Sequence, residues 1–176
     1  MLKRRPQAHE SIDYFKTYIR KVSGEDFVAV LRQSLAQNLA KLYTLTEAEW
    51  NHKYADDKWT VKEVLLHIMD TERIFAYRAL RIARNDKTPL MGFEQDDYVP
   101  YSEPDNRTPA SLIEEYELLR RSTIALFQNM SSEMLDRMGT ASGGGVSALA
   151  LGFMTAGHEI HHWQILEERY WKTQQS

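Results

Sequence analysis

Apolar residues recur at steps of three and four along four stretches of the chain, which is the pattern of amphipathic α-helices. The first stretch begins near Glu25, with its apolar positions at Val28, Leu31, Leu35, Leu39 and Leu42. The second, expected to end near Arg84, carries Val64, Leu65, Ile68, Phe75, Ala79 and Ile82. The third, expected to end near Met130, carries Leu112, Tyr116, Leu119, Thr123, Leu126 and Phe127. The fourth, residues 146–170, is apolar on nearly every face and is expected to be the most buried.

Short polar residues mark the starts of three of these helices. Thr60 and Glu63 fit a capping box, in which a hydroxyl and a carboxylate each satisfy a free backbone N–H of the first turn. Thr108 and Pro109 fit the N-cap and first position of the third helix, and Ser147 is a candidate cap for the fourth. Glu63 is therefore interpreted as a capping residue and not as a catalytic base.

Two connections between the helices differ from the rest. Residues 85–107 contain three of the five prolines and no helical period, and a connection this long is uncommon in a compact domain. Its aromatic residues Phe93, Tyr98 and Tyr101 indicate that it packs over something. Residues 139–145 are interpreted as a flexible turn, because they lack the lysine of a phosphate-binding loop and follow no predicted strand. The pattern predicts an all-α four-helix bundle with a long crossover between the second and third helices.

Length and composition favour one domain over the whole chain. The 176 residues, 43% of them hydrophobic, can bury one substantial core, expected at about residues 25–172. Residues 1–24 show no sustained period and are interpreted as an extended arm that packs on the domain. Gly152 and Gly157 in the fourth helix each cost roughly 1 kcal/mol relative to alanine, so a packing reason for them is expected.

Charge and cysteine content narrow the possible partners. A net charge of -3 provides no cationic field for a phosphate backbone, so no nucleic-acid partner is expected. The basic residues 1–5 are followed by polar residues instead of the apolar core of a signal peptide, and no run of about 18 apolar residues exists. A cytoplasmic protein without a membrane partner is therefore expected. Because the chain has no cysteine, nitrogen and oxygen atoms must hold any metal.

Candidate chemistry lies in histidines that face the interior of two predicted helices. His158 and His162 are four residues apart on the fourth helix, and at about 100° per residue they project within roughly 40° of each other. His67 belongs to the apolar stripe of the second helix. One inward histidine is more often a core residue than a ligand, and a hydrogen-bonded buried pair is the alternative for the other two. Three imidazoles in one bundle together favour a metal site with an open position for water.

Two details of the fourth helix bear on this hypothesis. His161 lies three residues after His158 and roughly 60° away, so geometry favours His162 over His161 as the partner of His158. Residues 158–162 also spell H-E-x-x-H, the zinc metallopeptidase motif, with Glu159 in the place of the general base. The metzincin continuation needs glycine and histidine where this chain has Ile165 and Glu168, and Glu159 points about 100° from His158. The context therefore disfavours a zinc metallopeptidase.

Taken together, the motifs resemble the DinB-like superfamily of four-helix metal proteins. The resemblance covers residues 27–170 and is carried, in order, by Trp59-Thr60-x-x-Glu63-x-x-x-His67, Asp70-x-Glu72-Arg73, Gly92-Phe93, Asp97 and A-G-H-E-I-H-H at 156–162. It implies a divalent ion bound by His67, His158 and His162, with His161 outside the ligand set. Zinc or nickel is the metal expected from the resemblance, with manganese and iron as alternatives.

The resemblance also implies a class of function. The better understood relatives are thiol transferases and isomerases that use bacillithiol, mycothiol or glutathione, many others are described as metal-dependent hydrolases, and relatives are frequently homodimers. We therefore expect a metal-dependent enzyme that activates water or a low-molecular-weight thiol against a small-molecule substrate, and that forms a homodimer. A non-catalytic metal-binding stress-response or scaffold protein is the alternative, and a purely structural bundle would need no metal.

Carboxylates near the predicted site are candidates for further roles. Asp70, one turn after His67, is the candidate catalytic residue that orients a ligand or carries a proton, with a solvated helix carboxylate as the alternative. Asp96, Asp97 and Tyr98 of the crossover are candidates to contact the substrate.

Overall fold

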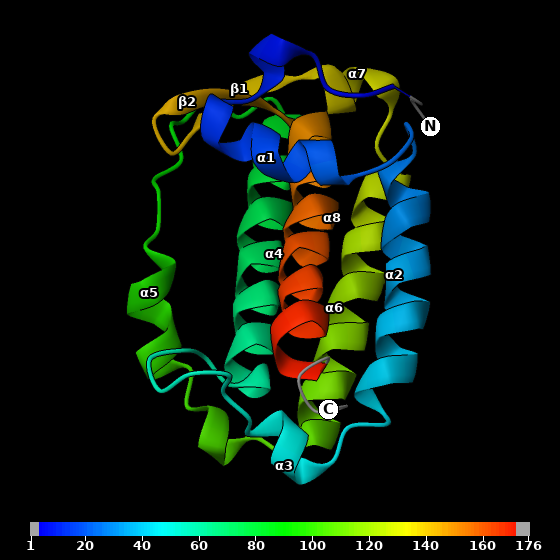
Figure 1. Ribbon diagram of the computed structural model, residues 1–176. Helices are drawn as coiled ribbons and strands as arrows, with labels where there is room; N and C mark the ends of the chain where they lie inside the picture. The colour runs from blue at the N-terminus through cyan, green and yellow to red at the C-terminus, as the bar shows by residue number, and fades with distance from the viewer. Residues whose placement is uncertain (1–3, 172–176) are drawn as a thin grey trace.

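Four long helices lie side by side in the computed structural model, which describes residues 4–171 (Figure 1). They are α2 (Phe27–Leu42), α4 (Val61–Ala83), α6 (Pro109–Gln128) and α8 (Ala148–Ile165), and a π-helical turn, η4 (Leu166–Trp171), continues α8. Helix α4 packs between α8 and α6, and α2 contacts both α6 and α8, so the four enclose a common core. The predicted four-helix bundle is confirmed. The ends of the expected arm and core, residues 1–3 and 172, lie outside the described residues.

The predicted capping residues begin the helices as expected. The Thr60 hydroxyl accepts from the Glu63 N–H at 3.1 Å, and the Glu63 carboxylate accepts from the Thr60 N–H at 2.7 Å. Thr108 caps α6, and the Ser147 hydroxyl accepts from the first turn of α8 at 2.9 Å. Helices α4 and α6 end close to the predicted limits. These caps fix where α4 and α8 begin, the two helices that carry the candidate histidines.

Residues of the predicted N-terminal arm are helical, so the expectation of an extended segment is wrong. They form a short 3-10 turn, η1 (Ala8–Glu10), and α1 (Asp13–Lys21), which lies across one end of the bundle against α8 (Figure 1). Ile19 is the buried residue of α1, and Phe15 packs on the core from a partly buried position. Two and a half turns present too few apolar positions to establish a helical period in the sequence.

The close packing of α8 explains its glycines. A Cβ atom on Gly157 would lie 2.0 Å from the backbone oxygen of Tyr18 in α1, and one on Gly152 would lie 2.4 Å from the Phe27 ring. The expected packing reason is therefore confirmed at both positions.

Replacing Gly157 with alanine is expected to destabilise the protein by about 1–3 kcal/mol, because the added methyl group overpacks the contact between α1 and α8. Alanine alone would favour the helix by roughly 1 kcal/mol, but the Tyr18 carbonyl is backbone and has no rotamer that avoids the clash. Urea unfolding followed by circular dichroism measures the difference. An increase in stability would show that α1 does not pack against α8 in solution.

Residues around the predicted flexible turn form a β-hairpin, so that interpretation is wrong. Strands β1 (Met138–Ala141) and β2 (Gly144–Ser147) pair antiparallel, with Met138 opposite Ser147. Ser142 and Gly143 have φ of 50° and 78°, as a two-residue hairpin turn with positive φ at both positions requires. Three glycines and no apolar alternation hide these strands in the sequence.

The hairpin holds the start of the crossover. The Leu90 N–H donates to the Thr140 carbonyl at 2.9 Å, and the Ser142 N–H donates to the Leu90 carbonyl at 3.0 Å. From there the chain runs along the outside of α4 through α5 (Gln95–Tyr98) and two 3-10 turns, η2 (Val99–Tyr101) and η3 (Pro104–Asn106) (Figure 1). Two further short helices, α3 (Glu47–Trp50) and α7 (Ser132–Asp136), complete the connections. The long crossover between α4 and α6 is thus an ordered layer beside the bundle.

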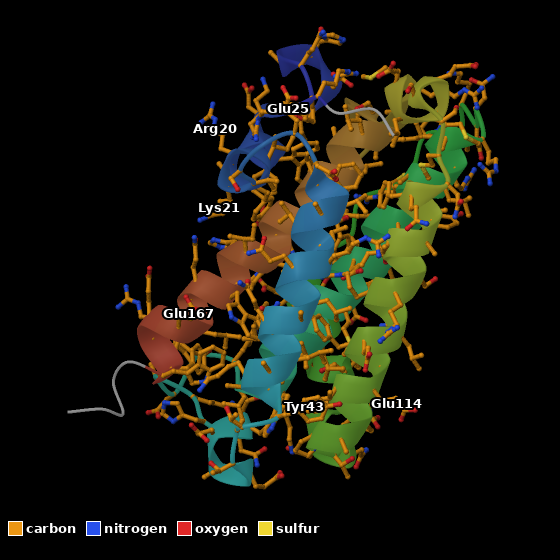
Figure 2. All side chains as sticks on the ribbon, turned by 90° about the vertical axis from the view of Figure 1, so that its right-hand side faces the viewer. Arg20, Lys21, Glu25, Tyr43, Glu114 and Glu167 are labelled. Carbon is orange, nitrogen blue, oxygen red and sulfur yellow. The ribbon has the colours of Figure 1, made fainter. Side chains whose placement is uncertain are left out.

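Charged side chains cover the outside of the bundle. Figure 2 shows the labelled residues projecting from its surface, and all of them are exposed: Arg20, Lys21, Glu25, Tyr43, Glu114 and Glu167. None of the helices within residues 4–171 combines the length and the apolar character that a membrane crossing requires.

Glu10 holds the N-terminal segment and makes it sensitive to acid. Burial alone would raise the pKa of Glu10, but the Arg4 guanidinium at 2.6 Å and the Gln7 N–H lower it below 4.5. Because the folded-state pKa is lowered, this contribution to stability is present above the ordinary pKa of glutamate and is lost as the pH falls through the lowered pKa. Glu10→Gln is expected to cost about 1–3 kcal/mol at pH 7 and progressively less in acid, measured by urea unfolding from pH 7 to 3. A difference between the two proteins that does not change with pH would contradict this role.

Candidate metal centre

His67, His158 and His162 converge at one point between α4 and α8. Their Nε2 atoms form a triangle with sides of 3.0 Å (His67 to His158), 3.1 Å (His67 to His162) and 3.1 Å (His158 to His162). His67 and His158 are buried, and His162 is partly buried. Within residues 4–171, this is the one group of three or more histidine, aspartate or glutamate side chains that lie close enough together to hold an ion. The structure thus brings the three predicted ligands together, and metal binding by them stays a prediction.

The triangle suits a single divalent ion better than a hydrogen-bonded cluster. Three imidazole nitrogens bound to one ion at about 2.0–2.1 Å, with angles of about 90–110° between the bonds, lie about 2.9–3.4 Å apart. A ring nitrogen of neutral imidazole carries either a proton or a lone pair, so among three Nε2 atoms at least two have the same role. At least one of the three contacts is then not a hydrogen bond. A cation accepts all three lone pairs and removes this conflict.

The protein environment keeps these imidazoles neutral. Burial, with a smaller contribution from His161, lowers the pKa of His67 to about 4. Burial and the neighbouring His67 lower the pKa of His162 to about 3, and burial lowers that of His158 well below its ordinary value. At pH 7 each ring is uncharged, which is the state that binds metal.

Aromatic rings enclose the triangle. The Trp59 ring centroid lies 5.0 Å from that of His67, and the Tyr18 centroid lies 5.3 Å from that of His158. His161 packs between Tyr18, at 5.6 Å, and His162, at 5.0 Å, and its ring nitrogens are outside the triangle. The spacing of four residues from His158 to His162 therefore places both imidazoles in the triangle, whereas His161, three residues after His158, lies beside it.

Glu159, the glutamate of H-E-x-x-H, contacts a buried ion-pair network and not the histidines. Its carboxylate accepts from the Arg120 guanidinium at 2.6 and 2.8 Å, from the Ser34 hydroxyl at 2.6 Å and from the Tyr116 hydroxyl. Arg120 also donates to Glu72 of α4 at 2.8 Å, and its side chain is fully buried. With its oxygens occupied by this network, Glu159 is a structural carboxylate, in agreement with the expectation that the motif does not mark a peptidase.

A cavity of about 740 Å³ reaches the histidines at His158. Its walls come from α1, α4, residues 89–96 of the crossover and the hairpin, so the prediction that the crossover packs over something is confirmed. Thr71, one turn after His67 on α4, also lines it, and the buried Thr71 hydroxyl oxygen has no hydrogen-bond partner.

The predicted carboxylates divide between two cavities. Asp96 lines the cavity at His158, whereas Asp70, Asp97 and Tyr98 line a separate one of about 380 Å³. Asp70 forms an ion pair with Arg73 at 3.6 Å, and burial raises the pKa of Asp70. No hydrogen bond or ion pair among the described residues joins Asp70 to a histidine of the triangle, and its catalytic role stays a prediction.

Comparisons with known proteins agree with this architecture. Residues 30–166 match the DinB superfamily. Putative metal-dependent hydrolase OB0413 of Oceanobacillus iheyensis is 25% identical over 148 residues, which cover 81% of this chain and 84% of that protein. YfiT from Bacillus subtilis, described as "a probable metal-dependent hydrolase with an unusual four-helix bundle topology", has a TM-score of 0.73 at 16% identity over 99% of this chain and 95% of its own. The mycothiol-dependent maleylpyruvate isomerase has a TM-score of 0.63 at 15% identity over 82% of this chain and 61% of its own.

Proposed function

The chain belongs to the DinB superfamily, and we propose that it is a metal-dependent enzyme whose ion is held by His67, His158 and His162. The observation that carries the proposal is the Nε2 triangle at the wall of a cavity of about 740 Å³. This volume is typical of sites for small molecules. A metal-binding scaffold protein would need the same triangle, but it would not need a cavity that leads to it.

The chemistry of the site favours activation of a nucleophile. A divalent ion bound by three neutral imidazoles would supply a water or a thiol that is deprotonated near neutral pH. Tyr18 and Phe75 pack against the His158 ring and restrict water around it. Because the chain has no cysteine, any thiol must come from a second small molecule.

Hydrolysis and thiol transfer are the two reactions that fit the proposed metal site and its cavity. The name of the Oceanobacillus relative and the description of YfiT support hydrolysis, whereas the mycothiol-dependent isomerase shares the fold with a thiol-using reaction. The cavity volume is large enough for a substrate together with a thiol cosubstrate, which favours transfer as the second candidate. Imidazole ligands suit zinc and nickel, and we propose one of these as the ion.

Metal content measured by mass spectrometry on tag-free protein tests the proposal. The wild-type protein is expected to hold about one ion per chain, and His67→Ala and His158→Ala are expected to lose it because each removes one of three ligands. Loaded wild-type protein is then assayed for ester and amide hydrolysis, and for transfer to bacillithiol, mycothiol and glutathione. Turnover lost with a chelator and restored by zinc or nickel supports an enzyme. No bound ion after reconstitution with zinc, nickel, manganese or iron would overturn the proposal.

A further inference from the structure

The cavity beside the histidines contains a buried cation without a carboxylate partner. Arg78 of α4 is 3% exposed and lines this cavity. Its Nη2 atom donates to the Met91 carbonyl at 2.7 Å, and its guanidinium carbon lies 5.9 Å from the centre of the Phe93 ring. On the same helix Arg73 pairs with Glu115 and Arg81 pairs with Asp86, but no carboxylate among the described residues lies within ion-pair distance of Arg78.

Arg78 therefore has binding capacity that the fold does not use. A guanidinium has five N–H donors and stays protonated at neutral pH even where burial lowers its pKa, as it does here. A single hydrogen bond to Met91 uses one donor. None of the nitrogen atoms of Arg78 is both fully buried and unpartnered, so the donors that Met91 does not use keep some accessible surface, and Arg78 lines the cavity. A buried charge without a counter-charge is costly, and a bound anion would remove this cost.

One face of α4 joins this cation to the metal centre. His67, Thr71, Phe75 and Arg78 follow one another at steps of four, four and three, so they lie on one side of the helix. All three residues after His67 line the cavity, which His158 also reaches. The cavity thus has the Arg78 cation at its wall, apolar rings beside it, and one of the candidate metal ligands, His158, farther along.

The charges around the cavity indicate which anion fits. Among the described residues that line the cavity, Arg78 is the one cationic side chain, and Glu94 and Asp96, both exposed, add two carboxylates. Like charges repel, so this balance disfavours a phosphate ester with two negative charges and accepts a single one. A guanidinium binds a planar carboxylate through two parallel hydrogen bonds.

We propose that Arg78 binds the carboxylate of a monoanionic substrate whose apolar part packs against Phe15, Phe75 and Leu90. This assignment rests on the proposed function, because it places the reacting end of that substrate at the histidine triangle. Arg78 is thereby the residue that selects the substrate class, an organic carboxylate with an apolar body.

NMR titration of zinc-loaded protein with hexanoate, hexanamide and hexyl phosphate tests this inference. The three probes share one chain and differ in the charge of the head group. Hexanoate is expected to bind more tightly than the other two and to shift the Arg78 Nε–H resonance, which a merely structural arginine would not show. Arg78→Gln is expected to weaken hexanoate binding by about 10- to 100-fold and to leave hexanamide unchanged. Arg81→Gln, which changes a surface-paired arginine of the same helix, is the matched control and is expected to bind as the wild type does.

The outcomes separate this inference from the proposed function. Equal binding of hexanoate and hexanamide by the wild type, tighter binding of hexyl phosphate, or an unmoved Arg78 resonance would overturn the carboxylate assignment without use of a variant. Hexanoate binding that is lost on zinc removal but kept in Arg78→Gln would place the carboxylate on the ion, which overturns the inference and supports the metal centre. Binding that depends on Arg78 in a protein that holds no metal would support the anion site and overturn the proposed function alone.

Discussion

Replacing Arg120 with methionine is expected to lower the free energy of unfolding by about 3–5 kcal/mol, because it leaves buried carboxylates without a counter-charge. The Arg120 side chain is fully buried, and those of Glu72 and Glu159 are each 2% exposed. Burial alone would raise the pKa of Glu159, but the charge and hydrogen bonds of Arg120 keep it below its ordinary value. Methionine fills a similar volume, so loss of charge compensation and not a void dominates the effect. Urea unfolding at pH 7 is expected to show a lower midpoint with a similar slope.

Two further variants isolate the cause of this loss. Arg121→Met removes the neighbouring arginine, which is exposed and pairs with Glu117 on the surface, and is expected to cost less than about 1 kcal/mol. In the Arg120→Met background, Glu72→Gln with Glu159→Gln removes the unpaired charges and is expected to restore part of the lost stability. If Arg120→Met were as stable as Arg121→Met, the ion-pair network would not be what holds α4, α6 and α8 together.

The sequence determines much of the candidate site because the relevant positions obey local rules. Thr60 and Ser147 identify the first turns of α4 and α8 by capping alone. Once these helices are placed, the apolar stripe orients His67 inward and the spacing of four residues aligns His158 with His162. Helical periodicity therefore predicts which side chains face one another, as the triangle of Nε2 atoms shows.

The features that sequence reasoning missed depend on contacts between distant segments. Arg120 lies four residues after Tyr116 and three before Thr123, so it belongs to the buried stripe of α6. A charged side chain at such a position indicates an oppositely charged partner in the core. Its partners Glu72 and Glu159 come from other helices, so the pattern of any single helix does not identify them. The hairpin and α1 were missed for a related reason, since each is short and is stabilised by what it packs against.

Adjacent residues of α8 serve two separate clusters. His158 faces α4 and the cavity, whereas Glu159, the next residue, faces Arg120 of α6 and Ser34 of α2. Successive residues of a helix point about 100° apart, so the H-E-x-x-H sequence places its glutamate and its histidines in different environments. The histidines and the glutamate of the motif therefore belong to two separate clusters, and the hydrogen bonds of Glu159 go to Arg120, Ser34 and Tyr116.

The same helical geometry distinguishes His162 from His161 as a ligand. His162→Ala is expected to weaken zinc binding by more than about 100-fold, because loss of a ligand exceeds the effect of a residue that merely supports one. His161→Ala is expected to leave the affinity within a few-fold, since its ring lies against Tyr18 and His162 and outside the triangle. Each variant removes one partly buried imidazole from neighbouring positions of α8, so each controls for the packing cost of the other.

Competition with a zinc chelator measures both affinities, and thermal unfolding provides a second readout. Zinc at about 100 times the dissociation constant stabilises a protein that binds it only when folded by about 2.7 kcal/mol. This increase is expected in the wild type and in His161→Ala, and at the same zinc concentration it should fall to about 0.4 kcal/mol or less in His162→Ala. The reverse order would assign the ligands to a spacing of three residues, with α8 rotated relative to α4. Equal stabilisation of both variants would leave His67 and His158 as the protein ligands. His162 would then be a packing residue.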